Sequence, residues 1–128
     1  MDDDRLLGHA RDTMERAYAP YSGYRVGAAI LASDGSVVTG CNVENVSHGL
    51  TMCAERVALG SAVAAGARRF RRLVLVTDAS EPTPPCGACR QALAEFAERV
   101  YTLDVVVRVA PWAMPPLMPP PASQTENP

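Results

Sequence analysis

Apolar residues recur along the chain at two spacings, and each spacing predicts a type of secondary structure. A helical spacing of three to four residues is carried by Leu6, Leu7, Ala10, Met14 and Ala17. We therefore expect an amphipathic helix over residues 4–18. Acidic residues 2–4 stand at its start, where carboxylates can cap the helix and complement its dipole. The stretch 18–23, which contains proline and glycine, ends it.

Two β-rich stretches come next in the chain. Residues 24–32 and 37–43 flank Ser33-Asp34-Gly35-Ser36, whose composition favours a tight hairpin turn. The pattern predicts two antiparallel strands joined by this turn.

Helical and strand patterns alternate in the second half of the chain. Apolar spacing predicts helices over residues 52–64 and 86–99, and strands over residues 72–77 and 105–109. The run 72–77 is apolar enough for a strand buried on both faces. Two strand–helix–strand passages after a hairpin predict an α/β fold, with a layered sheet and helices on its faces.

The C-terminal end differs in composition. Of the residues from Pro111 onward, seven are proline, which neither donates to a strand ladder nor continues a helix. A chain of 128 residues has the length of one domain. We expect a domain over residues 1–110 and an extended or partly disordered tail over residues 111–128.

Charge and composition narrow the classes of function. A net charge of −2 and a pI of about 5.6 argue against nucleic acid or an anionic membrane as partner. The arginines within residues 68–72 fit a solvated strand edge. No apolar run approaches the roughly 20 residues that span a bilayer, and the acidic start is unlike a secretory signal. Four cysteines without such a signal favour a reducing cytoplasm.

Three cysteines and a glutamate have the composition of a catalytic zinc site. Cys53, Cys86 and Cys89 can supply three ligands, and a catalytic site keeps its fourth position open for water. Glu55 stands two residues after the first of them and need not be a ligand. Its carboxylate can therefore move protons to and from that water.

A Cys-x-x-Cys pair is also typical of a structural zinc knuckle or a redox couple. A structural site needs a fourth ligand, and the spare candidates Cys41, His9 and His48 stand at no usual ligand spacing from Cys53. A redox site leaves Glu55 without a role. The catalytic interpretation uses every residue of the pattern.

The N-termini of two predicted helices affect the charge of this site, because two of its cysteines lie there. Cys53 and Cys86 fall near them, where the helix dipole lowers thiol pKa and favours the thiolate. Three thiolates on Zn²⁺ leave a net charge of −1, which opposes acidification of water. Arg56 is our candidate to hydrogen-bond the sulfurs and withdraw charge, with Arg90 as a weaker one. The alternative for Arg56 is an ordinary surface position.

These motifs together resemble a known family. The Cys-x-Glu and Pro-Cys-x-x-Cys pattern is that of zinc-dependent nucleobase deaminases in their three-cysteine form. Over residues 5–100 the chain resembles the small homotetrameric cytidine deaminases. The motifs are Ala19-Pro20-Tyr21-Ser22, Arg25-Val26-Gly27-Ala28-Ala29, Gly40-Cys41-Asn42-Val43-Glu44-Asn45, Gly49-Leu50-Thr51, Cys53-Ala54-Glu55-Arg56 and Pro85-Cys86-Gly87-Ala88-Cys89-Arg90-Gln91.

The resemblance implies a three-layer α/β/α sandwich with a mixed sheet that opens with the hairpin. It implies zinc-dependent hydrolysis of cytidine and deoxycytidine to the uridines and ammonia, in pyrimidine salvage, with Glu55 as the proton carrier. Asn42 and Glu44 would bind the ribose hydroxyls. Tyr24 would line the pyrimidine pocket, and Ala54 would offer backbone groups to the base. The alternatives are turn residues for Asn42 and Glu44, and a core aromatic for Tyr24.

The resemblance also implies a homotetramer with shared active sites, in which Val46 and His48 match the residues that a neighbouring subunit supplies. Two departures concern the pocket. His48 stands where the family usually has tyrosine, and it could equally be a surface histidine. The family's closing aromatic is absent after Leu117-Met118-Pro119, where Ala122 stands instead, and Trp112 has a different spacing.

Several functions are compatible with the pattern. The first is the deamination of plain cytidine, and a variant is the same reaction on N4- or C5-substituted or bulkier cytosine nucleosides. A nucleic-acid-editing deaminase should carry a basic groove and aromatic platforms, which an acidic chain with 5% aromatic residues lacks. The alternative of another class is a zinc-stabilised binding module without catalysis.

Overall fold

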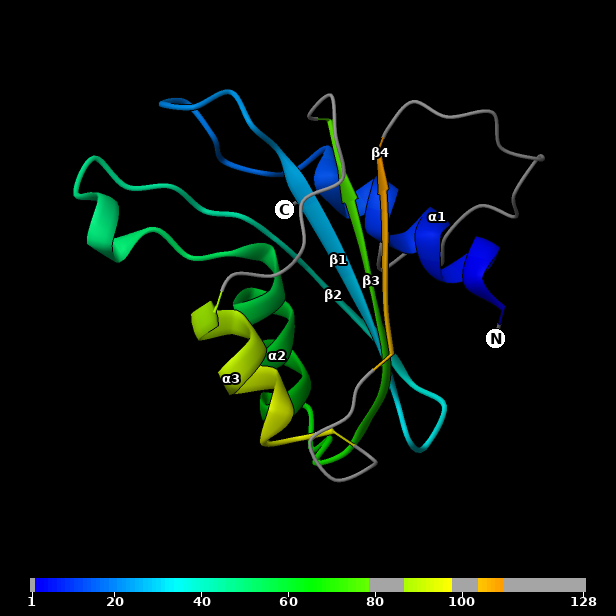
Figure 1. Ribbon diagram of the computed structural model, residues 1–128. Coiled ribbons are helices and arrows are strands. Elements are labelled where there is room, and N and C mark those ends of the chain that lie inside the picture. Colours follow the sequence, from blue (N-terminus) through cyan, green and yellow to red (C-terminus); the bar gives the residue numbers. More distant parts are fainter. Residues whose placement is uncertain (1, 79–86, 98–103, 110–128) are drawn as a thin grey trace.

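The computed structural model describes residues 2–78, 87–97 and 104–109. Helices and strands follow one another much as the apolar spacing predicts (Figure 1). The elements are α1 (Asp3–Met14), β1 (Val26–Ala32), β2 (Val37–Cys41), the short 3-10 helix η1 (His48–Leu50), α2 (Ala54–Ala64), β3 (Phe70–Thr77), α3 (Gly87–Ala94) and β4 (Asp104–Val109). Only η1 was not predicted.

The strands form one mixed sheet in the order β2-β1-β3-β4. Strand β1 pairs antiparallel with both β2 and β3, whereas β3 and β4 are parallel. Helix α1 covers one face of this sheet, and α2 and α3 cover the other (Figure 1). The predicted three-layer α/β/α arrangement, opened by a hairpin, is confirmed.

Helix α1 is capped and packed as its sequence indicates. Asp2 is the N-cap residue, and its carboxylate accepts a hydrogen bond from the Arg5 amide at 2.9 Å. A core cluster joins the helix to β1 and β3. Its buried members are Leu6, Leu7, Ala10, Met14, Ala29, Leu31, Val74 and Val76. A Cβ at Gly27 would lie 1.9 Å from the Ala10 carbonyl oxygen, so only glycine allows this close packing of α1 on β1.

Helix α2 approaches the opposite face through small side chains. Its buried stripe consists of Ala54, Ala58 and Ala62, with Glu55 beside it. A Cβ at Gly40 of β2 would lie 2.4 Å from the Ala58 amide nitrogen. The helix therefore lies almost directly on the backbone of the sheet.

Tertiary hydrogen bonds end two elements earlier than their apolar patterns predict. Helix α1 stops at Met14 rather than near residue 18, because the chain at Tyr18 pairs with another segment. The Tyr18 amide donates to the Asn42 carbonyl at 3.0 Å, and the Glu44 amide donates to the Tyr18 carbonyl at 2.8 Å. Strand β2 ends at Cys41 rather than residue 43. The Asn42 amide still donates to the Val26 carbonyl at 3.2 Å, but the Asn42 carbonyl and the Glu44 amide pair with Tyr18.

The remaining predictions concern the second half of the chain. Strand β3 is buried over most of its length, as expected for a strand covered on both faces. Helix α3 ends at Ala94, and the Phe70 amide then donates to the Phe96 carbonyl at 2.7 Å. Cys86, the end of the predicted helix at residues 98–99 and the predicted tail 111–128 lie outside the described residues. No helix among the described residues is long and apolar enough to cross a membrane.

Candidate active site

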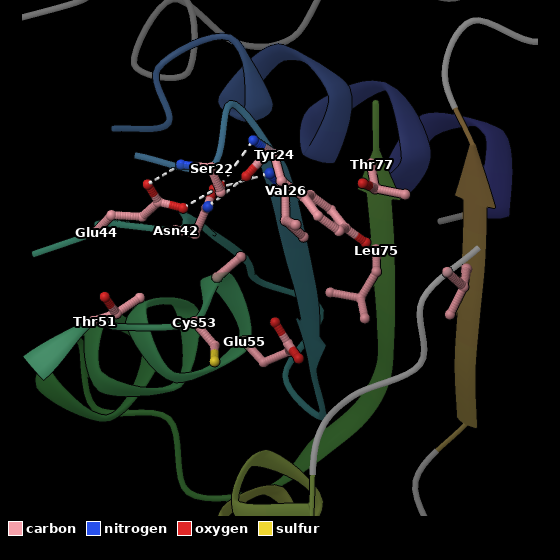
Figure 2. A pocket seen from close by; sticks show the side chains of 12 residues that line it. Ser22, Tyr24, Val26, Asn42, Glu44, Thr51, Cys53, Glu55, Leu75 and Thr77 are labelled. Atoms are coloured by element: carbon pink, nitrogen blue, oxygen red, sulfur yellow. Dashed lines mark hydrogen bonds between the residues drawn. The ribbon is translucent and has the colours of Figure 1, made fainter. Parts of the chain in front are cut away.

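A cavity of about 240 Å³ lies between the start of α2, the sheet and the segments that flank β1 and β2 (Figure 2). Its sheet side is lined by Val26, Leu75 and Val107 among others. Polar groups gather in two places. Cys53 and Glu55 lie at the start of α2, and a second group lies around the ends of β1 and β2 (Figure 2).

The N-terminus of α2 places the first of these groups. Cys53 is the N-cap residue, with extended backbone and no capping hydrogen bond from its side chain. Serine, threonine, asparagine and aspartate are the usual residues at this position. A thiol there is exposed to the positive end of the helix dipole, which favours the thiolate. Cys53 also lines the cavity, so its sulfur faces space that a ligand can occupy.

Glu55 is a buried carboxyl group on the cavity wall. Its residue is only 6% exposed, although it lies in the first turn of a helix. Burial raises the pKa of Glu55, and hydrogen bonds from its own amide and from Cys89, together with the charge of Arg56, oppose that rise. A carboxyl group with a raised pKa is suited to accept and release protons near neutral pH.

Cys89 connects α3 to the Glu55 carboxyl group. It is fully buried in α3, and its thiol hydrogen-bonds the Glu55 carboxyl group. The Cys89 thiol therefore contacts the Glu55 carboxyl group, and Cys53 lines the same cavity two residues before Glu55. Thiols beside a carboxyl group are donor chemistry that fits zinc. Within the described residues no three metal-binding side chains converge. Cys86, the third predicted ligand, directly precedes α3 in the sequence and lies outside the described residues.

Asn42 holds the segment before β1 against the end of β2. Its side-chain oxygen accepts a hydrogen bond from the Val26 amide at 2.9 Å, and its side-chain nitrogen donates to the Tyr24 carbonyl at 2.8 Å. Asn42 is 8% exposed and lines the cavity. The side-chain amide of Asn42 therefore holds the cavity wall in place, and Asn42 is itself part of that wall.

Glu44 also bonds to the segment before β1, at Tyr21 and Ser22. One carboxylate oxygen accepts hydrogen bonds from the amides of Tyr21 (3.0 Å) and Ser22 (3.1 Å), and the other accepts from the Ser22 hydroxyl (Figure 2). The Ser22 hydroxyl bond is the main cause that lowers the pKa of Glu44. Glu44 is thus an ionised acceptor at the cavity edge.

Comparisons with known proteins agree with this geometry. The model of a family described as the cytidine and deoxycytidylate deaminase zinc-binding region matches residues 1–104. The chain belongs to this family. A cytidine deaminase of Halalkalibacterium halodurans is 52% identical over 96 residues, which cover 75% of this chain and 73% of that protein. A cytidine deaminase of Mycobacterium tuberculosis is 44% identical over 108 residues, which cover 84% of this chain and 81% of that protein.

A solved structure has the same fold. The crystal structure of cytidine deaminase from Burkholderia pseudomallei matches with a TM-score of 0.80 at 47% identity, and the match covers 87% of each chain. A zinc-binding deaminase domain therefore accounts for most of this chain.

The other residues predicted for the family's site lie in different places. Tyr24 and Ala54 line the cavity, and the Tyr24 ring extends toward β3 (Figure 2). Val46 is 73% exposed and is not part of the cavity wall. His48 lines a neighbouring cavity of about 260 Å³ together with Glu44.

Arg56 is exposed, and its guanidinium group donates to the Thr51 carbonyl at 3.1 Å. This bond fixes the side chain across the start of α2, where its charge acts on Glu55. The predicted contact with the cysteine sulfurs remains a prediction.

Sequence reasoning did not assign several residues of the cavity wall. Ser22 and Thr51 lie within the motifs of the family resemblance, but their side chains had no predicted role. Leu75 and Thr77 alternate along β3 on the face that α2 covers, so strand periodicity carried a signal for them. The two-residue alternation along β3 could not show, however, which end of the strand borders the cavity.

Proposed function

We propose that this protein is a zinc-dependent hydrolase that converts cytidine and deoxycytidine to uridine and deoxyuridine with release of ammonia. The observation that carries this proposal is the buried Glu55 carboxyl group, which lines a largely apolar cavity together with Cys53 and is hydrogen-bonded by the Cys89 thiol. Relatives named cytidine deaminase support it, because the segment matched by the family model includes all three residues.

Cys53 and Cys89 would hold the zinc ion together with Cys86. Cys53 is the N-cap residue of α2 and Cys89 lies in α3, so these two helices would set the spacing of the two sulfurs. When bound there, zinc supplies Lewis acidity and lowers the pKa of water at the position that the protein leaves open.

Glu55 would carry the protons of the reaction. Water loses a proton as its oxygen bonds to C4 of cytosine, and the Glu55 carboxylate accepts that proton. The carboxyl group then delivers this proton to ring nitrogen N3. It next takes the proton of the new hydroxyl group on C4 and passes it to the amine, so that a carbonyl group forms at C4, the bond from C4 to the amine breaks and ammonia departs. Burial suits the group to both tasks because it raises the pKa of Glu55.

Four further residues would hold the nucleoside. The Tyr24 ring and the backbone of Ala54 border the part of the cavity next to Glu55, where the base would lie. Asn42 and Glu44 lie at the other polar end and would accept or donate hydrogen bonds to the sugar hydroxyls. This division matches an apolar ring with a polar sugar.

The loop between β2 and α2 supports assembly into a homotetramer with shared active sites. It exposes several large apolar side chains, as surfaces that associate often do. They are Val43, Val46, Leu50 and Met52, which are 40%, 73%, 66% and 46% exposed. Val46 and His48 lie off the wall of the main cavity, which leaves them available to a neighbouring subunit. Sedimentation of the active protein tests this: an active monomer would remove the shared site.

One assay tests the proposed function. The protein is incubated with cytidine, deoxycytidine, N4- and C5-substituted cytidines and adenosine, and ammonia release is measured. Turnover of plain cytidine is expected, and turnover of substituted cytidines alone would favour the variant substrate class. Bound zinc with no turnover of any nucleoside would show a binding module instead.

Zinc content gives a second, independent measurement. Metal analysis should find about one zinc per chain, and Cys89→Ser should lose most of it. Cys41→Ser is the matched control, because Cys41 lies on β2 and lines neither cavity described above. The reaction would serve pyrimidine salvage, and thiolate ligands favour a reducing compartment, for which we propose the cytoplasm.

A further inference from the structure

Ser22 links Glu44 to the backbone at Tyr24, at the end of the cavity where the sugar would lie. Its hydroxyl donates to Glu44 and accepts from the Tyr24 amide at 3.0 Å. Its own amide donates to the other Glu44 oxygen at 3.1 Å. One side chain thus fixes both the carboxylate of Glu44 and the backbone at Tyr24, although Ser22 and Glu44 are 22 residues apart in the chain.

The number of hydrogen bonds shows what remains for a ligand. A carboxylate has about four acceptor positions. The amides of Tyr21 and Ser22 occupy two on one oxygen, and the Ser22 hydroxyl occupies one on the other oxygen. The Ser22 hydroxyl has two acceptor positions, of which the Tyr24 amide takes one. Within the part of the chain that the structure describes, Glu44 and Ser22 therefore each keep one acceptor position, side by side on the cavity wall.

We propose that Ser22 is a positioning residue that orients the Glu44 carboxylate and, with it, forms a paired acceptor for sugar hydroxyl donors. This inference rests on the proposed function, since it assumes that a nucleoside occupies the cavity. Two adjacent acceptors match the hydroxyl donors of a sugar, and they do not match an anionic group, which offers no donor.

The position of Ser22 predicts which kinetic constant it affects. Ser22 and Glu44 lie at one end of the cavity, and Cys53 and Glu55 lie at the other (Figure 2). Among the described residues, the hydrogen bonds of Ser22 join it to Glu44 and Tyr24 and not to α2 or α3. Loss of the hydroxyl should therefore weaken nucleoside binding and leave the proton transfers at Glu55 intact.

The hairpin turn offers a matched control. The Ser36 hydroxyl donates to an Asp34 carboxylate oxygen at 2.6 Å, and the Ser36 amide donates to the same oxygen at 2.9 Å. This serine–carboxylate pair has the same chemistry as Ser22 with Glu44. It lies in an exposed turn and lines neither described cavity.

The test compares Ser22→Ala, Ser22→Thr and Ser36→Ala with cytidine as substrate. A hydrogen bond to a charged group is worth roughly tenfold or more in an equilibrium constant. Ser22→Ala should raise KM about tenfold with kcat within about twofold of wild type. Ser22→Thr should restore KM because it restores the hydroxyl, and Ser36→Ala should change neither constant.

A double-mutant cycle separates positioning from general loosening. If Ser22 acts partly through Glu44, Ser22→Ala should raise KM by a clearly smaller factor in a Glu44→Gln background than in the wild-type background. Equal effects in both backgrounds, or an unchanged KM in Ser22→Ala, would overturn the inference while the activity of the wild type stands. A wild type that deaminates no cytidine would instead overturn the proposed function, and this inference with it.

Discussion

The two faces of the sheet are built from alternate residues of the same strands, and they serve different purposes. Under α1 the core consists mainly of larger aliphatic side chains, such as Leu6, Leu31 and Val76. On the other face, the buried apolar residues of α2 are all alanines, and the cavity lies at the N-terminal end of this helix. The small residues let α2 lie close to the sheet, and its first turn then carries the reactive groups. The reactive groups therefore lie on the α2 face, although Ile30, Phe70 and Leu73 also give that face a stabilising core.

The largest expected effect comes from the cavity face. Glu55→Gln should lower kcat by roughly 10²–10⁴-fold or more, because the amide cannot carry protons. The near-identical shape should leave folding and zinc content unchanged. Steady-state kinetics, metal analysis and thermal unfolding of the same preparation check this. Glu95→Gln, an exposed glutamate of the turn after α3, is the control and should behave as wild type. Near-normal turnover in Glu55→Gln would place the proton carrier elsewhere.

The next prediction concerns the face under α1. Leu6 is fully buried there, so Leu6→Ala should lower the free energy of unfolding by about 2–5 kcal/mol. The folded fraction should keep kcat and KM within about twofold. Urea unfolding followed by circular dichroism gives the first quantity, and assays well below the transition give the second. A large loss of activity at full folding would contradict the separation of the two faces.

Two glycines sharpen the comparison, since each lies under a helix on its own face. Gly27→Ala and Gly40→Ala should each destabilise by at least about 1–3 kcal/mol, because a Cβ would meet helix backbone. Only Gly40→Ala should also lower activity, because it displaces α2. Gly60→Ala is the control: it has open space in α2 and should stabilise by about 0.5–1 kcal/mol. Equal activity in the Gly27 and Gly40 variants would show that α2 tolerates displacement.

The smallest effect concerns a buried histidine of α1. His9 is 6% exposed, and its Nδ1 has no hydrogen-bond partner in the described part of the chain. Burial, and then the charge of Arg5, lower the pKa of His9, with Asp12 acting in the opposite direction. The unfolded chain takes up its proton near pH 6.5, at a higher pH than the folded protein. Stability from this group is therefore complete above that pH and is lost as pH falls below it.

His9→Leu should reduce this acid sensitivity. The measurement is the urea midpoint of both proteins at pH 7.5 and pH 5.5, compared as a difference between variant and wild type. The comparison matters because thiolate ligands also protonate in acid and would affect both proteins alike. Identical pH dependence in the two proteins would show that His9 does not contribute.

The sequence predicted the order of the elements and the proximity of Cys53 to Glu55 for physical reasons that can be named. Apolar spacing is a local property, so α1, the hairpin and β3 could be read directly from it. Cys53 and Glu55 are neighbours in one helical turn, which places them together in any fold that keeps α2. Cys89 was assigned to the same site as Glu55 from zinc chemistry rather than from spacing, and its thiol hydrogen-bonds Glu55 in the structure.

The remainder depends on contacts between distant segments. The apolar pattern of the first helix continues past Met14, but the pairing of Tyr18 with Asn42 ends the helix there. The bond between Ser22 and Glu44 joins the loop before β1 to the chain after β2, and no periodicity encodes it. A three-residue helix such as η1 is too short to produce an apolar period.

The two hydrogen bonds of Asn42 have a consequence for how mutations of this protein are interpreted. Its side chain offers one acceptor and one donor to the backbone at residues 24–26, as a further peptide group of β2 would. Few side chains of that length carry both functions. A mutational scan would therefore score Asn42 as intolerant even if no substrate touched it. Sensitivity at this position reports first on the architecture of the pocket wall, and only a ligand-binding measurement on a folded variant can assign it to recognition.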